Sequence, residues 1–239
     1  MAAKHWGPSV AGWLAGLPIV AGPILFFLAQ DHGAAFASAA AASSFSAVFA
    51  SIAFSLAYAH IAQRSAWAAA LTGALVAWGI AAILLSLLPA NAWLSSLVAV
   101  TTLIVAPGLF PDTGSHTFKH SGNSVELVCR MLAGAVLTFA VTLVSGKIGS
   151  GWSGLFAVFP VLGVVLAVFS HRTHGAIFAA TLLRAMATGM YSFSIFCFVL
   201  SFSLTKLNVA ASFLIAASAA VGVQAVTKKQ ITHRSRVEP

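Results

Sequence analysis

Charged side chains are scarce in this chain, and acidic ones are the scarcest. Only 7% of its 239 residues are charged, whereas about a quarter are charged in a usual soluble domain. So few charges cannot cover a water-facing surface, which excludes an ordinary soluble protein. The four acids are Asp31, Asp112, Glu126 and Glu238, and none lies mid-way along an apolar stretch. A proton- or sodium-coupled cation antiporter is therefore disfavoured, because such carriers need a buried carboxylate.

Cysteine and catalytic motifs are also nearly absent. Cys129 and Cys197 lie in apolar segments without CxxC spacing, so both are predicted to be small buried side chains rather than redox groups or metal ligands. The sequence contains no GxSxG, no HExxH, no paired carboxylates and no phosphate-binding loop. We therefore predict that the protein is not an enzyme and that it uses no metal or cofactor.

Apolar residues are abundant: 60% of the chain is hydrophobic. Eight stretches approach the length of about 20 residues that a membrane crossing requires. They are residues 9–29, 34–59, 66–88, 91–110, 125–146, 152–170, 176–203 and 207–227. We therefore predict an all-α bundle of about eight transmembrane spans. A seven-span alternative would fuse or drop one of the two stretches that meet near Pro89.

The positive charges support an even number of spans. Eight Lys and Arg residues fall on the side of the even-numbered connections, and only Lys147 and Lys206 fall on the other side. This bias is typical of cytoplasmic loops and places both termini in the cytoplasm. It assigns the net charge of +8 to membrane orientation and to contact with lipid head groups, not to nucleic acid.

The spans divide the chain into two membrane halves. Residues 1–110 hold spans one to four, 111–124 form a cytoplasmic loop, and 125–227 hold spans five to eight. Residues 228–239 form a basic cytoplasmic tail. The predicted location is a bacterial inner membrane.

An internal repeat relates the two halves. Between residues 12–37 and 154–179, nine of 26 positions are identical without a gap. The identities include Pro18 with Pro160 and the His-Gly pairs at His32 and His174. The copies lie five spans apart, so we predict that the second runs in the opposite direction, as in many carriers. The alternative is that helices rich in small residues resemble one another because packing favours Gly and Ala.

Two prolines and one arginine are the predicted substrate-binding residues. Pro18 and Pro160 interrupt matching spans, and such interruptions free backbone groups that can bind a ligand near the midplane. Arg184 lies within span seven, where a cation commonly faces a cavity. The alternatives are a proline kink that only aids packing, and an arginine that extends to the interface. Tyr191 and Ser194 follow Arg184 on the same helix and offer hydroxyl groups.

Part of the second half resembles a known family. The stretch around Gly154, Leu155, Phe159, Pro160, His171 and Arg184 is similar to GlpM-type small bacterial inner-membrane proteins. The resemblance spans residues 123–226, and it implies a helical inner-membrane protein without assigning a ligand. Members of that family are about half the length of this chain, so the N-terminal copy of the repeat is a departure from the family's pattern.

These observations predict a secondary transporter with alternating access. With one buried cation and no buried acid, the substrate is expected to be an anionic or neutral small molecule, or an amphipathic lipid-like one. The alternative is a non-transporting scaffold or regulatory subunit of a larger inner-membrane complex. The expected partners are membrane lipids, the substrate, and either further copies of the chain or another membrane subunit, without nucleic acid.

Overall fold

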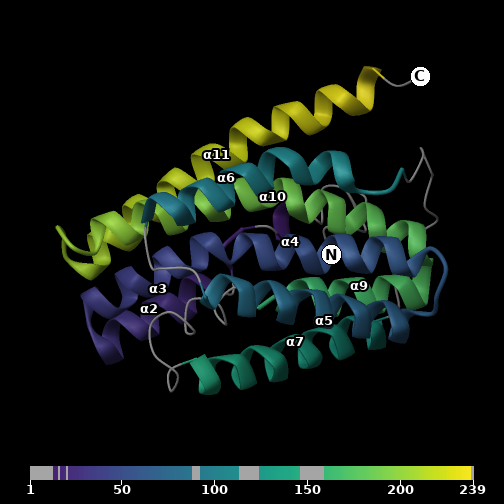
Figure 1. Ribbon diagram of the computed structural model, residues 1–239, viewed down its shortest axis with the longest axis horizontal. Coiled ribbons are helices and arrows are strands. Elements are labelled where there is room, and N and C mark those ends of the chain that lie inside the picture. Colours follow the sequence, from purple (N-terminus) through teal and green to yellow (C-terminus); the bar gives the residue numbers. More distant parts are fainter. Residues whose placement is uncertain are drawn as a thin grey trace.

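Every regular element in the described part of the chain is an α-helix. The computed structural model describes residues 13–15, 17–19, 21–87, 92–112, 124–145 and 159–237. Its helices are α2 (Ala21–His32), α3 (Ala34–Ser46), α4 (Val48–Ala62), α5 (Trp67–Ser86), α6 (Ala92–Leu109), α7 (Ser124–Ser145), α9 (Val161–His174), α10 (Ala176–Ser203) and α11 (Val209–Val237). The helices lie side by side along one direction (Figure 1), which confirms the predicted all-α bundle.

Four of the described helical stretches are long and apolar enough to cross a membrane. They are Ala34–Ala62, which joins α3 to α4, then Trp67–Ser86, Ala176–Ser203 and Val209–Thr227. Two shorter apolar helices, Ser96–Leu109 and Val128–Val141, lie within α6 and α7. By their length and composition, these helices are compatible with a membrane protein.

Large apolar side chains point outward from the bundle. On α7, Met131, Val136 and Phe139 are each about two-thirds exposed, as expected for a surface that faces lipid. Cys129 lies on α7 and is exposed, which corrects the prediction that both cysteines are buried. The cause is that α7 packs mainly against α9, so most of its surface faces outward. Cys197 is fully buried, as predicted.

Helix α10 lies at the centre of the fold. It packs against α3, α4, α6, α9 and α11 (Figure 1). Alanines without exposed surface lie on these helices, among them Ala37, Ala41, Ala59 and Ala179. Small side chains allow helix backbones to approach closely, which is how helices associate in the absence of a hydrophobic driving force.

One interruption agrees with the sequence prediction, and one boundary differs from it. Residues 17–19 are non-helical and α2 begins at Ala21, as the interruption predicted at Pro18 requires. At the C-terminus, α11 continues as a helix through the predicted tail to Val237. No Pro or Gly follows Gly222 before that point, so nothing in the sequence stops the helix at the end of the apolar stretch. Helices α5 and α6 are separate helices.

Helix boundaries recur with the spacing of the sequence repeat. Helices α2 and α9 end at His32 and His174, and the next helices begin at Ala34 and Ala176. Helices α5 and α11 begin at Trp67 and Val209. The members of each pair are 142 residues apart. These boundaries therefore match between the two copies, whereas the starts of α2 and α9, at Ala21 and Val161, are 140 residues apart.

The two glycines between these helices adopt one conformation. Gly33 has φ 86° and ψ 167°, and Gly175 has φ 87° and ψ 175°. This region of backbone space is essentially restricted to glycine. Beside each glycine a histidine ring stacks on a phenylalanine ring, with centroids 4.6 Å apart for His32 and Phe36 and 4.5 Å apart for His174 and Phe178. The His-Gly identities therefore correspond to a shared local structure.

Hydrogen bonds join the start of the described chain to α11. The indole Nε1 of Trp13 donates to Thr227 Oγ1 at 3.0 Å, and Gln224 Nε2 donates to the Trp13 carbonyl at 2.8 Å. Trp13 is only 6% exposed, so water is not a ready substitute for these partners. The contact holds the segment before Pro18 against the last helix.

Thr227→Val is expected to lower the free energy of unfolding by about 1 kcal/mol, because it removes the acceptor of the buried indole N–H. Thr181→Val is the matched control, since the Thr181 hydroxyl donates to the Ile177 carbonyl of its own helix. Thermal unfolding in detergent micelles would measure the difference. Equal midpoints of thermal unfolding for Thr227→Val and Thr181→Val would contradict a stabilising role for the Trp13 contact.

Candidate functional site

The two repeated prolines interrupt the backbone in the same way. Each lacks an N–H group and so cannot continue a helical ladder. After Pro18, the Ile19 N–H donates to the Leu17 carbonyl at 2.7 Å. After Pro160, the Val161 N–H donates to the Phe159 carbonyl at 2.6 Å. These i to i+2 bonds close tight γ-type turns, and the φ of −75° and ψ of 56° at Pro160 fit that geometry.

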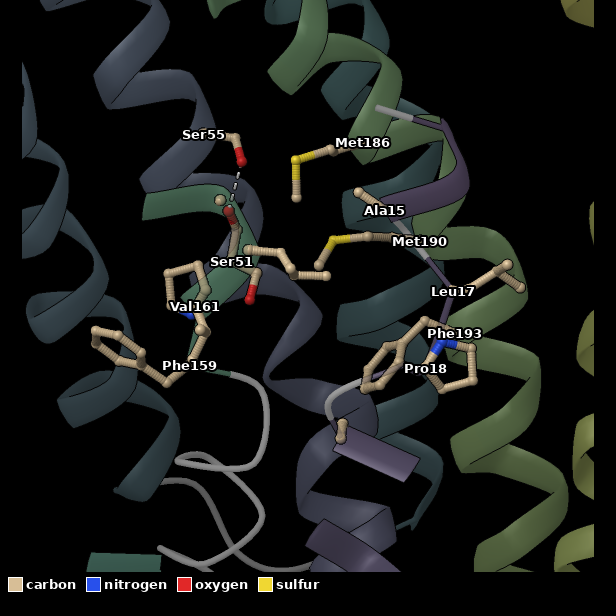
Figure 2. Close-up of a pocket in the computed structure, with 14 residues that line it drawn as sticks. Ala15, Leu17, Pro18, Ser51, Ser55, Phe159, Val161, Met186, Met190 and Phe193 are labelled. Carbon is tan, nitrogen blue, oxygen red and sulfur yellow. Dashed lines mark hydrogen bonds between the residues drawn. The ribbon is translucent and has the colours of Figure 1, made fainter. Parts of the chain in front are cut away.

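A cavity of about 70 Å³ lies between the two interruptions. Pro18 and Pro160 both line it, together with Ala21 and Val161, the first residues of α2 and α9. Figure 2 shows the Pro18 segment on one side of the cavity and the Phe159–Val161 segment on the other. Two prolines 142 positions apart in the sequence therefore line one cavity.

Two serines of α4 supply hydroxyl groups to this cavity. Ser51 and Ser55 are spaced i, i+4, so they lie on one face of α4, and both are buried. The Ser55 hydroxyl donates to the Ser51 carbonyl at 2.9 Å (Figure 2). That carbonyl belongs to the same helix, so the bond leaves the lone pairs of the Ser55 oxygen available to a ligand donor.

Helix α10 forms the opposite wall with soft apolar groups. Met186 and Met190 also have i, i+4 spacing, and Phe193 follows on the same face. In Figure 2 the side chains of both methionines extend from α10 towards the serines. Thioether side chains are polarisable and flexible, so this wall can adapt to ligands of different shape.

Three of the predicted site residues lie outside the cavity lining. The Tyr191 hydroxyl donates to the Leu103 carbonyl at 2.8 Å and so joins α10 to α6. Ser194 is buried, and its hydroxyl has no hydrogen-bonding partner in the described part of the chain. Arg184 is the third. The cavity therefore brings together Pro18 and Pro160 but not the polar residues predicted on α10.

Arg184 extends towards the end of α6. Its Nη1 lies 4.0 Å from Oδ1 of Asp112, its side chain is 34% exposed, and Asp112 is fully exposed. An ion pair in contact with solvent contributes little to stability, at most about 1 kcal/mol. This position agrees with the alternative in which the long side chain reaches the interface.

A second polar cluster lies where α4 and α9 end. The Tyr58 hydroxyl and Nδ1 of His171 are 3.3 Å apart, and the Arg172 guanidinium lies 5.4 Å from the centroid of the Trp67 ring. Partial burial lowers the pKa of His171 below its usual value, which favours the neutral ring at pH 7. The cluster ties the end of α9 to α4 and α5 without lining the cavity.

The residues that give the cavity its chemistry carry little signal in the sequence. Ser51, Ser55, Met186 and Met190 lie in helices that are apolar on every side, so no polar face marks the inward direction. The one available signal was the offset of 142, which pairs Ser51 with Phe193. No group of three or more metal-binding side chains occurs among the described residues.

Comparison of the chain with models of protein families, with curated proteins and with solved structures gives no match. The function must therefore be argued from the site.

Proposed function

We propose that this chain is a secondary carrier of the bacterial inner membrane, with its substrate site in the cavity between Pro18 and Pro160. The observation that carries the proposal is that two interrupted segments, 142 residues apart in sequence, line one small cavity. Interrupted helices at corresponding positions of a repeat are the recurrent substrate sites of transporters.

An inverted repeat of three spans is part of the proposal. Ser38, near the start of α3, donates a 2.6 Å hydrogen bond to the Ser201 carbonyl, near the end of α10. Tyr58, near the end of α4, meets His171, which lies just before the start of α10. The α3–α4 stretch and its counterpart α10 therefore run antiparallel (Figure 1), as two oppositely directed copies would.

Eight spans with both termini in the cytoplasm are the proposed topology. The four apolar helical stretches supply spans two, three, seven and eight, and α6 and α7 correspond to spans four and five. The remaining two spans are the interrupted ones, which continue as α2 and α9. In alternating access, one copy would rock against the other around the cavity between them.

The proposed substrate is a small molecule that is anionic or neutral. None of the described residues that line the cavity is acidic or basic, and no carboxylate is present there to hold a coupling cation. Helices α2 and α9 begin at the cavity, so their positive dipole ends also disfavour a cation. The proposal assigns no catalytic residue, metal or cofactor to the chain.

Uptake into proteoliposomes tests the proposal. Purified protein reconstituted in lipid vesicles is expected to accumulate at least one labelled small metabolite, and the same compound is expected to raise the unfolding temperature in detergent. The rival function, a scaffold or regulatory subunit, predicts no stabilisation by any small molecule and co-purification of a second membrane protein. That pair of results would overturn the carrier proposal.

Arg184→Ala is expected to leave uptake unchanged and to lower the free energy of unfolding by less than about 1 kcal/mol. The reason is that Arg184 pairs with the exposed Asp112 and lies outside the cavity lining. Initial uptake rates at several substrate concentrations would measure the effect, with Arg184→Lys as the control that keeps the charge. Loss of uptake in the alanine variant, restored by lysine, would instead assign Arg184 to substrate recognition.

A further inference from the structure

The cavity lining offers no charge to an ionic ligand. It consists of prolines, aliphatic and aromatic side chains, two methionines and two serines, all of them uncharged. Moving an ion from water into such a site costs several kcal/mol unless an opposite charge or a full set of hydrogen bonds compensates. Arg184, the cation nearest in sequence to the cavity residues of α10, is directed towards Asp112 instead.

Part of the backbone at the interruptions is hydrogen-bonded without a ligand. The Ile19 and Val161 N–H groups donate within the γ-type turns, and the Gly22 and Val164 N–H groups donate to the carbonyls of Pro18 and Pro160 at 2.9 Å and 2.7 Å. The prolines themselves contribute no N–H. The first N–H group beyond each proline is therefore not available to an anion. The positive dipole ends of α2 and α9 favour an anion by only about 0.3–1 kcal/mol each, which is less than the cost of moving an ion into the cavity.

The remaining groups suit a weakly polar molecule. The Ser55 oxygen can accept a hydrogen bond from a ligand, and the methionines and Phe193 present polarisable apolar surface. The cavity of about 70 Å³ is half the volume of an apolar cavity that accommodates benzene, which is about 150 Å³. The space fits a molecule smaller than benzene.

We infer that the cavity takes a small uncharged molecule, smaller than benzene and carrying a hydrogen-bonding group, and that it rejects anions. This inference rests on the proposed function and narrows its substrate class. The serine wall on α4 would orient the polar end of the ligand, and the methionine wall on α10 would contact its apolar part.

The reactivity of a cysteine placed in the cavity tests this inference. Ser55→Cys is made in a Cys129→Ala parent. The parent retains the buried Cys197, and its modification by each reagent gives the background. Three methanethiosulfonates that share one reacting group are compared: the methyl reagent, the longer n-butyl reagent, and the anionic 2-sulfonatoethyl reagent. Intact-protein mass spectrometry follows modification in proteoliposomes. Gln63→Cys, in the exposed turn after α4, gives the intrinsic reactivity of each reagent.

After normalisation to Gln63→Cys, the methyl reagent is expected to react fastest. The normalised rate of modification by the n-butyl reagent is expected to be at least ten times the rate with the sulfonatoethyl reagent. A tenfold difference in rate corresponds to about 1.4 kcal/mol. Met190→Cys on the opposite wall repeats the test if Ser55→Cys does not fold. Equal or faster reaction of the anionic reagent would overturn the uncharged substrate and leave the carrier proposal standing. No reaction with any reagent at either position would overturn both, because the cavity would then be closed to solutes.

Discussion

Gly33→Ala and Gly175→Ala are each expected to lower the free energy of unfolding by about 1–3 kcal/mol. Both glycines combine a φ near +87° with an extended ψ, a conformation that a side chain makes costly. A steric clash does not cause the expected loss of stability, because an added Cβ would meet no atom within 4 Å at either position. The expected loss is therefore a backbone effect.

In the double variant, the free energy of unfolding is expected to fall by about the sum of the two single losses. The junction of α2 with α3 and that of α9 with α10 lie at opposite ends of the bundle (Figure 1). Distant sites without shared contacts add to within about 0.5 kcal/mol. Chemical or thermal unfolding in detergent micelles would measure all three variants against the parent.

Gly79→Ala is the matched control for this series. Gly79 lies within α5, and an added Cβ there also meets nothing within 4 Å. Alanine favours a helix over glycine by about 1 kcal/mol, so this variant is expected to be as stable as the parent or more stable. If Gly33→Ala and Gly175→Ala matched Gly79→Ala, the positive φ would not be required at the two turns.

The same turns show how much of the fold the sequence could predict. The identities at His32, Gly33 and Phe36 with their partners predicted a repeat, and the helix boundaries and ring stacking fall at the matching positions. Pro18 and Pro160 likewise indicated interrupted backbone, because proline cannot continue a helical ladder. Local backbone chemistry was thus readable from local sequence.

The direction in which side chains point was not readable in this way. Arg184 could face a cavity or the interface on sequence grounds, and its contact with Asp112, which follows the end of α6, agrees with the interface. Ser55 and Met190 resemble many other residues of their helices until packing places them on two sides of one space. In a membrane protein the outward face is as apolar as the core, so periodicity does not mark the inner face.

Ser55→Leu is expected to reduce uptake strongly while leaving the protein folded. The larger side chain would occupy much of the cavity of about 70 Å³. Forcing a ligand into a filled site costs about 1–3 kcal/mol, which corresponds to a roughly 5- to 150-fold loss of affinity. Folding should tolerate the change, because the Ser55 hydroxyl bonds only to the carbonyl of Ser51 in its own helix, so its removal leaves no unpaired donor.

Two further variants separate the causes of that loss. Ser218→Leu makes the same substitution on the exposed side of α11 and is expected to retain uptake and stability. Ser55→Ala keeps the space and removes only the hydroxyl, so it is expected to weaken substrate binding by about tenfold or less. Initial uptake rates in proteoliposomes, with unfolding temperatures in detergent, would distinguish these results. Full uptake by a folded Ser55→Leu variant would show that the substrate does not pass through the cavity between Pro18 and Pro160.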